Sequence, residues 1–361
     1  MDVAIKGRRL ERFGMSLYLV FGRRTGRIGF GIFCGVFALS SAMAQASIAP
    51  RTSERSCEGR VETREAGRFS VDPIDEASGL ALSPDGQHFF VTNDSGDSPR
   101  FFRTRLDGST IEEFSFKGYK PIDAEDISVG PCPSGITGSC VALADIGDNR
   151  DRRKNVTLGF FRIDELPKPP TGPGRGRLAA VEIPLAKKIK FVYPEGPRNA
   201  EAFGVLNSRY GVIVSKRQEK KSRATLPADV YVVDFEKEQT AKVAEWDVPT
   251  WVKDQGLGAL VTGLSIAPMA AGSGSVRILL LTYRDVIEVT ATTDILTSTT
   301  WPPKPWVLTS RSVLKVDPLE QQEAIAYDAK GTGFYYATEA PLALLGYKTA
   351  PIRYVEKIVC Q

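Results

Sequence analysis

Histidine is almost absent from this chain: His88 is the only one in 361 residues. A His-rich zinc centre is therefore excluded, and a Ser-His-Asp arrangement would have a single possible centre. The composition, with 42% hydrophobic and 25% charged residues, also excludes wholesale disorder, a collagen repeat and a multi-span membrane protein. Any chemistry is expected to use carboxylates, hydroxyls and amines, with or without a hard cation.

The positive net charge comes from the N-terminal segment. Residues 1–46 contain seven Lys and Arg against two Asp and Glu, a net charge of +5, whereas the whole chain carries +4. Residues 47–361 therefore sum to −1. This balance gives no general case for nucleic-acid binding.

Residues 1–46 have the organisation of a signal peptide. Three arginines precede an apolar run of about a dozen residues, 28–39, and small residues follow it. The run is shorter than the roughly 20 residues that a membrane-spanning helix needs. Two A-x-A patterns predict cleavage after Ala44 or Ala46. We therefore expect residues 47–361 to be exported by the Sec or twin-arginine route, as one periplasmic or secreted domain without membrane attachment.

Five segments of the exported part share one pattern of residues. Each has a polar residue at its third position, then a small or acidic residue, then alternating apolar residues. The third-position residues, spaced by 47, 76, 61 and 61 residues, are Ser78, Glu125, Glu201, Thr262 and Glu323. A second strand follows each segment and ends in a polar residue: Asn93, Asp145, Lys216, Tyr283 and Glu339.

Repeated hairpin units of this size predict an all-β protein, a β-propeller with five blades of four strands. Six blades would need one blade without the pattern. A β-sandwich is the alternative fold, but it gives no reason for the same polar position to recur five times. The segment 60–71 precedes the first repeat and is expected to supply the fourth strand of the last blade.

Four cysteines remain after removal of the signal peptide, an even number that suits an oxidising compartment. Closure of the ring brings the two ends of the chain together, which places Cys57 and Cys360 on neighbouring strands. The sequence therefore predicts the pairs Cys57–Cys360 and Cys132–Cys140, the second of which pins a single turn.

The third-position residues and the second-strand ends are expected to meet at one face of the ring, around the central tunnel. Three converging carboxylates repel one another unless a hard cation lies between them, and an all-oxygen set favours Ca²⁺, with Mg²⁺ second. The alternative is that these side chains only form hydrogen bonds between blades or hold tunnel waters. His88 lies in a hairpin turn expected at the opposite face, which argues against a catalytic role.

The order hydroxyl, Glu, Glu, hydroxyl, Glu resembles the soluble calcium-activated nucleotidases (apyrases). That family has a five-bladed propeller whose tunnel Ca²⁺ is held by Ser, Glu, Glu, Ser and Glu; Thr262 departs from Ser but keeps the hydroxyl. The segments Thr-Asn-Asp-Ser-Gly-Asp and Asp-Ile-Gly-Asp-Asn look closer still to secreted bacterial propellers with TolB-like or phytase-like labels. The resemblance supports a metal site better than it supports a substrate.

The resemblance also implies catalytic residues. Asn93-Asp94 resembles an Asp-Asp pair of the apyrases, and Lys216-Arg217 resembles an Arg-Arg pair. Hydrolysis of a phosphoanhydride or phosphoester would use Lys216 and Arg217 to contact phosphate and Asp94 or Asp145 to orient water. A small anionic ligand is then the expected partner.

Two other functions use the same carboxylates. The propeller could be a non-catalytic binding or scaffold protein in which the ion only ties blades together, since fold alone does not choose a function. Ester or lactone hydrolysis around Ca²⁺ is the third option, and it needs no cationic clamp.

Overall fold

The computed structural model describes residues 55–356, with gaps at 173–175, 254–255, 270–272, 299, 340–343 and 345. The predicted signal peptide lies outside these residues, so its cleavage and the export of the chain stay predictions. Within the described residues, no helix has both the length and the apolar character that crossing a bilayer requires.

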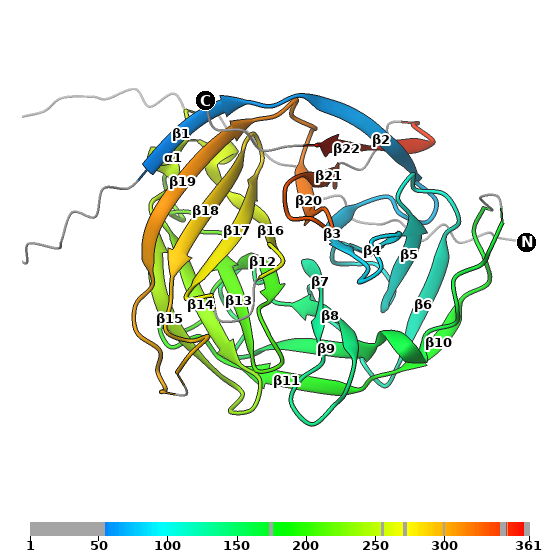
Figure 1. Ribbon diagram of the computed structural model, residues 1–361, viewed down its shortest axis with the longest axis horizontal. Coiled ribbons are helices and arrows are strands. Elements are labelled where there is room, and N and C mark those ends of the chain that lie inside the picture. Colours follow the sequence, from blue (N-terminus) through cyan, green and yellow to red (C-terminus); the bar gives the residue numbers. More distant parts are fainter. Residues whose placement is uncertain are drawn as a thin grey trace, which may run out of the picture. The chain divides into compact units, whose positions relative to one another are not determined.

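Five inner strands form a closed ring, and each begins with one of the repeated segments (Figure 1). They are β3 (Ala77–Leu82), β7 (Asp126–Pro131), β12 (Ala200–Val205), β16 (Val261–Ile266) and β20 (Gln322–Tyr327). Each packs against the next, and β20 packs against β3. The predicted five-bladed propeller is therefore confirmed.

Each inner strand is followed outward by three antiparallel strands, which are runs rich in β-branched and aromatic residues. The second strands are β4 (His88–Asn93), β8 (Ser139–Asp145), β13 (Tyr210–Ser215), β17 (Ser275–Thr282) and β21 (Phe334–Thr338). The third strands are β5 (Arg100–Arg105), β9 (Val156–Arg162), β14 (Ala228–Asp234), β18 (Val286–Thr292) and β22 (Thr349–Val355). The fourth strands are β6 (Glu112–Lys117), β11 (Lys187–Phe191), β15 (Gln239–Trp246), β19 (Val307–Lys315) and β2 (Thr63–Ser70). We number the blades 1 to 5 in the order of their inner strands.

The ring is closed by a strand from the other end of the domain. β2 runs antiparallel to β22, with a register that extends from Thr63 opposite Val355 to Ser70 opposite Thr349. Blade 5 thus combines three strands from the end of the chain with one from its beginning. The expectation that segment 60–71 supplies this strand is confirmed.

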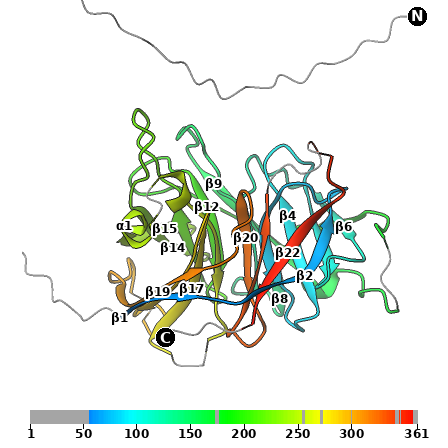
Figure 2. The same cartoon turned by 90° about the horizontal axis from the view of Figure 1, so that it is seen from above.

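Two blades carry a fifth, parallel strand that the sequence did not predict. β1 (Arg55–Arg60) pairs with β19 of blade 4, and β10 (Val181–Pro184) pairs with β6 of blade 1. Figure 2 shows β1 and β2 following each other along the outer edges of adjacent blades. Both extra strands cover edges that would otherwise leave backbone groups unpaired.

Three short helical turns complete the described secondary structure. They are η1 (Ile163–Glu165), α1 (Val248–Trp251) and η2 (Leu257–Ala259). η2 immediately precedes β16, so it lies at the face of the ring where the inner strands begin.

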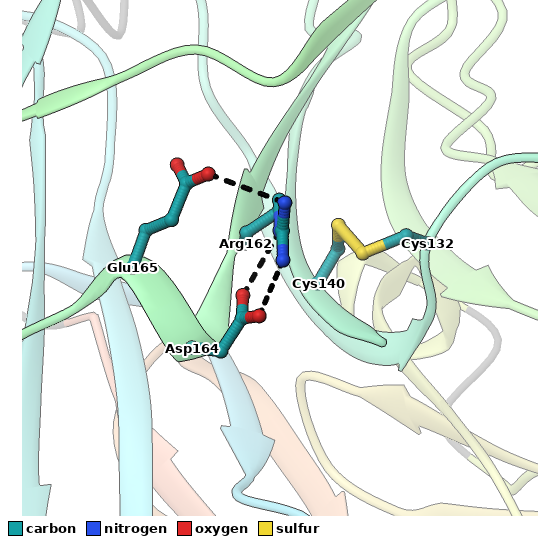
Figure 3. The surroundings of a disulfide bond; sticks show 5 residues. All are labelled: Cys132, Cys140, Arg162, Asp164 and Glu165. Carbon is teal, nitrogen blue, oxygen red and sulfur yellow. Dashed lines mark hydrogen bonds and ion pairs between the residues drawn. A yellow bond between two sulfur atoms is a disulfide. The ribbon is translucent and has the colours of Figure 1, made fainter. Parts of the chain in front are cut away.

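One of the two predicted disulfides is present. Cys132 and Cys140 are bonded across the β7–β8 hairpin (Figure 3). On the neighbouring strand β9, Arg162 lies opposite Cys140 and binds Asp164. Cys57 lies on β1, but Cys360 is outside the described residues, so the Cys57–Cys360 pair stays a prediction.

The core lies between adjacent blades. Both faces of most strands are covered, which explains near-continuous apolar runs such as Tyr210–Ser215 in β13, all of them buried. Aromatic rings fill the space between blades 1 and 2, where Phe116 stacks on Phe161 at 4.5 Å between ring centroids. This packing fixes the inner strands, and with them the side chains at the mouth of the tunnel.

Candidate metal and ligand site

Four of the five third-position residues lie at β-bulges, and the fifth, Glu125, directly precedes its inner strand. In β3 the register passes from Ala77 opposite Asn93 directly to Gly79 opposite Thr92, which leaves Ser78 as the extra residue. The same skip occurs at the corresponding residues of three other inner strands, namely Glu201, Thr262 and Glu323. In blade 2, the Glu125 N–H donates to the carbonyl of Ala144, the same residue that pairs with Asp126.

A bulge takes one residue out of the strand alternation and re-aims its side chain. All five third-position residues are at most 3% exposed. In four blades the repeated polar position in the sequence is therefore the position of a bulge. This is the structural reason why polar side chains recur at one place in these otherwise apolar strands.

The residue after the bulge is small where the next blade comes very close. A Cβ on Gly79 would lie 2.6 Å from the backbone nitrogen of Ile127. A Cβ on Gly263 would overlap the carbonyl oxygen of Glu323. Glycine at these two positions lets adjacent inner strands touch near the tunnel axis.

The two hydroxyl groups of the predicted metal set form hydrogen bonds between blades. The Ser78 hydroxyl donates to the Glu125 carbonyl at 2.6 Å, and the Thr262 hydroxyl donates to the Gln322 carbonyl at 2.8 Å. Each hydroxyl keeps lone pairs that can accept another contact. For these two residues, the interpretation as ties between blades has direct support.

Lys216 brings a positive charge into the tunnel mouth. Its ammonium contacts the carboxylate of Glu201, lies 3.6 Å from Glu323 Oε1, and is 2.7 Å from the hydroxyl of Tyr283. Burial alone would lower the pKa of Lys216, but the two carboxylates outweigh it and raise the pKa well above its usual value. An ammonium has three N–H donors; Glu201 and Tyr283 accept hydrogen bonds from it, and the Glu323 carboxylate lies at ion-pair distance.

A group of carboxylates lies on the side of blades 1 and 2. Oxygens of Asp94, Asp123 and Glu125 lie within 4.8 Å of one another. Burial raises the pKa of Glu125 well above its usual value, and the charges of Glu201, Asp94 and Asp123 add to the shift. Burial also raises the pKa of Asp123, as does the charge of Asp94.

Glu339, at the end of β21, connects the two sides of the mouth. Burial raises the pKa of its carboxyl group, and the neighbouring charges of Glu323 and Asp94 add to the shift. Six carboxyl groups therefore gather at the mouth: Asp94, Asp123, Glu125, Glu201, Glu323 and Glu339.

Asp145 is already occupied by protein donors. Its Oδ1 accepts from the backbone N–H of Asp123 at 2.9 Å and lies 2.8 Å from Arg153 Nη2. Its Oδ2 accepts from the Thr157 hydroxyl at 3.0 Å. These contacts favour a role for Asp145 in holding the loop that carries Asp123. The action of Asp145 on water stays a prediction.

The Asp-Ile-Gly-Asp-Asn segment packs against two carboxylates of this group. Gly147 lies so close to Glu125 Oε1 and Asp123 Oδ2 that a Cβ at this position would overlap both. Asp148 accepts from the backbone N–H of Arg153 at 2.8 Å, and the Arg153 guanidinium donates to the Gly147 carbonyl at 2.7 Å. Arg153 is therefore part of the scaffold of this loop.

Arg217 does not share the environment of Lys216. Its guanidinium donates to Asp229 Oδ1 at 3.1 Å, on the third strand of blade 3. Adjacent residues of an extended chain point in opposite directions, which separates the two cations. Burial alone would raise the pKa of Asp229, but Lys242, Arg217 and Arg198 together lower it.

Sequence reasoning missed Asp123 as a member of the site, whereas Glu339 was expected at this face as the polar end of a second strand. Asp123 opens the second repeated segment, where the other segments begin with Glu76, Asn199, Leu260 and Gln321. Four of the five segments begin with a polar residue, and this repeated first position could have indicated that Asp123 belongs to the site. Glu339 was visible as the polar residue that ends a second strand, but its contacts with Asp94 and Glu323 depend on the closure of the ring.

Comparisons with known proteins find weak structural likenesses only. No family model and no curated protein matches the chain. An aldose sugar dehydrogenase from Streptomyces coelicolor in its PQQ-bound form is 11% identical, with a TM-score of 0.40, and the match covers 82% of this chain and 98% of that one. The gluconolactonase XC5397 from Xanthomonas campestris is 9% identical, with a TM-score of 0.37 and coverage of 77% and 80%.

TolB from Acinetobacter baumannii is 11% identical, with a TM-score of 0.30 and coverage of 65% of this chain and 46% of that one. TolB is thus among the solved structures that resemble this chain. The propeller architecture itself rests on the strand pairing described above. None of these comparisons bears on the resemblance to the apyrases.

Proposed function

We propose that this protein is an exported propeller that binds a divalent cation, Ca²⁺ before Mg²⁺, at the acidic mouth of its tunnel. The bound ion would hold a small anionic ligand, with a phosphorylated molecule as the first choice for hydrolysis. The observation that carries the proposal is the convergence of Asp94, Asp123 and Glu125 within 4.8 Å, in a group of six carboxyls.

The donor set fits a hard cation. Carboxylate oxygens are the ligands that Ca²⁺ prefers, and Ca²⁺ accepts six to eight of them in variable geometry. Burial and mutual repulsion raise the pKa values of Glu125 and Asp123, so these groups lack compensation for their charge. A divalent ion would supply that compensation.

The contacts of Lys216 refine the predicted ligand set. Its ammonium is bound to Glu201 and lies near Glu323, so these two carboxylates already have a positive partner. We therefore assign the ion to the side of Asp94, Asp123 and Glu125. Ser78, Glu201, Thr262 and Glu323, which complete the set expected from the sequence, would then surround the ion at greater distance or join it when Lys216 moves.

A bound divalent ion would polarise a phosphoryl oxygen and lower the pKa of bound water. Asp94 is the candidate for orienting water, because its carboxyl oxygen lies within 4.8 Å of those of Asp123 and Glu125, beside the proposed ion. Lys216 would contact phosphate only if one of its three present partners were released. Arg217 is bound to Asp229, so a direct phosphate contact would require it to leave that partner.

A non-catalytic propeller with a structural ion is the second candidate. The hydroxyls of Ser78 and Thr262 tie blades together, and Asp145 anchors a loop. Residues expected to serve chemistry thus already have structural partners, which favours this alternative over hydrolysis of esters or lactones.

Metal binding is tested by titrating Ca²⁺ and Mg²⁺ into EDTA-treated protein in a calorimeter. Asp123→Asn is expected to weaken Ca²⁺ binding by about 10-fold or more, because it removes one carboxylate ligand. Asp164→Asn is the matched control, since that aspartate is 58% exposed and binds Arg162, which lies opposite Cys140 at the other end of the blade from Glu125. Equal Ca²⁺ affinity in all three proteins, or no binding at all, would refute the metal site.

Catalysis is tested separately with nucleoside diphosphates, phytate and aryl esters, each with Ca²⁺ and with chelator. Chelator-sensitive release of phosphate that is lost in Asp94→Asn would support the hydrolase. Stabilisation by Ca²⁺ without turnover of any substrate would support the structural ion instead.

A further inference from the structure

A cleft of about 650 Å³ lies between blades 4 and 5, beside the tunnel mouth. Tyr283 and Arg284, directly after β17, form one wall, and residues 318–321, directly before β20, form the other. Leu257 and Gly258 of η2 complete the lining. This volume is in the range of small-molecule sites, which is roughly 300–1,000 Å³.

A buried glutamine fixes both walls of the cleft. The side-chain amide of Gln322 donates to the carbonyl of Thr282 at 2.8 Å and accepts from the backbone N–H of Leu319 at 3.1 Å. Gln322 is fully buried. The backbone on each side is therefore held by one side chain, and the cleft is pre-formed before any ligand binds.

The lining combines three apolar side chains and one tyrosine with the charged residues Arg284 and Glu320 and the polar Gln321. Leu257 is 57% exposed, although the next two residues of its turn are buried. A single exposed leucine is ordinary. Leu257 is informative because it lines the same cleft as Leu319, Pro318 and the ring of Tyr283.

Tyr283 also connects the cleft to the charged mouth. Its hydroxyl is 2.7 Å from the Lys216 ammonium, which contacts Glu201 and lies near Glu323. The cleft wall ends at Gln321, and Glu323 follows two residues later in the chain. A ligand can thus place an apolar group in the cleft while its other end reaches the tunnel mouth.

We propose that this cleft binds the aryl or other apolar group of a small ligand whose anionic end lies at the tunnel mouth. The part about the anionic end rests on the proposed metal site, whereas the apolar subsite stands on the cleft alone. The ligand class is therefore an apolar or aromatic anion rather than a compact one such as inorganic phosphate.

The test compares three probes by calorimetry: naphthylmethylphosphonate, methylphosphonate and uncharged naphthalenemethanol, all with Ca²⁺ present. The two phosphonates share one anionic group, so their difference isolates the aryl group. Naphthylmethylphosphonate is expected to bind about 10-fold more tightly than methylphosphonate, from the apolar area that it buries. Leu257→Gln is expected to remove most of this advantage without changing the melting temperature, because Leu257 is mainly exposed.

Val192→Gln is the matched control. Val192 is 58% exposed and lies between β11 and β12, outside the cleft, so its variant should keep the aryl advantage. An aryl advantage that is absent, or that survives in Leu257→Gln, would overturn the proposal. Binding of naphthalenemethanol that depends on Leu257, with no binding of either phosphonate, would keep the cleft and refute the anion site.

Discussion

Glu125→Gln is expected to stabilise the protein without Ca²⁺ and to destabilise it with Ca²⁺. Glu125 is 2% exposed, and its carboxylate shares the tunnel mouth with Asp94 and Asp123. Two unit charges 4.8 Å apart repel by about 3–4 kcal/mol at an effective dielectric constant of about 20. Glutamine has nearly the same shape but carries no charge.

The stability gained by Glu125→Gln has an upper limit, because in the parent protein a carboxylate under such repulsion can take up a proton and lose its charge. Protonation of a group with a usual pKa of 4.5 costs about 3.4 kcal/mol at pH 7. We therefore expect Glu125→Gln to raise the free energy of unfolding of the metal-free protein by up to about 3 kcal/mol. For a domain of about 300 residues, this corresponds to a rise of about 5 °C in melting temperature.

The gain is expected to depend on pH with a defined sign. Because the pKa of Glu125 is raised in the folded state, the folded protein binds more protons than the unfolded chain above pH 4.5. The stability contributed by this group therefore falls as the pH rises from 4.5 towards the raised pKa. The advantage of Glu125→Gln should be largest at neutral pH and should vanish below about pH 4.5.

Saturating Ca²⁺ should reverse the order of the two proteins. A ligand present at 1,000 times its Kd stabilises the folded state by about 4 kcal/mol. Glu125→Gln removes one carboxylate from the proposed ion site, so the variant should bind Ca²⁺ more weakly and gain less of this stabilisation. The assay is thermal unfolding in EDTA and in Ca²⁺, with Glu182→Gln on the exposed strand β10 as the control. A variant that is less stable than the parent by the same amount in both buffers would refute the reasoning.

Three further predictions concern stability alone. Lys216→Met leaves Glu201 with an unpaired buried charge and should lower the free energy of unfolding in EDTA by about 3–5 kcal/mol in urea titrations; an unchanged midpoint would contradict the ion pair. Asp229→Asn should lower the free energy of unfolding by about 2–4 kcal/mol at pH 7, because it removes the negative partner of Lys242, Arg217 and Arg198. Because the pKa of Asp229 is lowered in the folded state, this cost should disappear as the pH falls through that pKa, below 3.8, and a cost independent of pH would argue against it. Replacing Cys132 and Cys140 together by alanine should lower the free energy of unfolding by about 2–3 kcal/mol, because the disulfide closes a short loop. Reduction of the parent protein should lower its urea midpoint in the same way, and an unchanged midpoint would contradict the prediction.

The sequence determined the architecture because a repeated pattern reports a repeated environment. Five polar third positions, each followed by an apolar run and a second strand, were sufficient to predict five blades and the closing strand at 60–71. The short disulfide could also be predicted, since eight residues separate Cys132 from Cys140 at one turn. The extra strands β1 and β10 could not, because their partners lie in blades distant along the chain.

The contents of the tunnel mouth were decided by the tertiary structure. The sequence predicted the polar positions that converge there, since the bulge at the start of four inner strands is a local feature. It could not show that the Lys216 ammonium binds Glu201, or that Arg217 turns away to Asp229. Which charges become partners depends on distances between blades, and those distances exist only after packing has closed the ring.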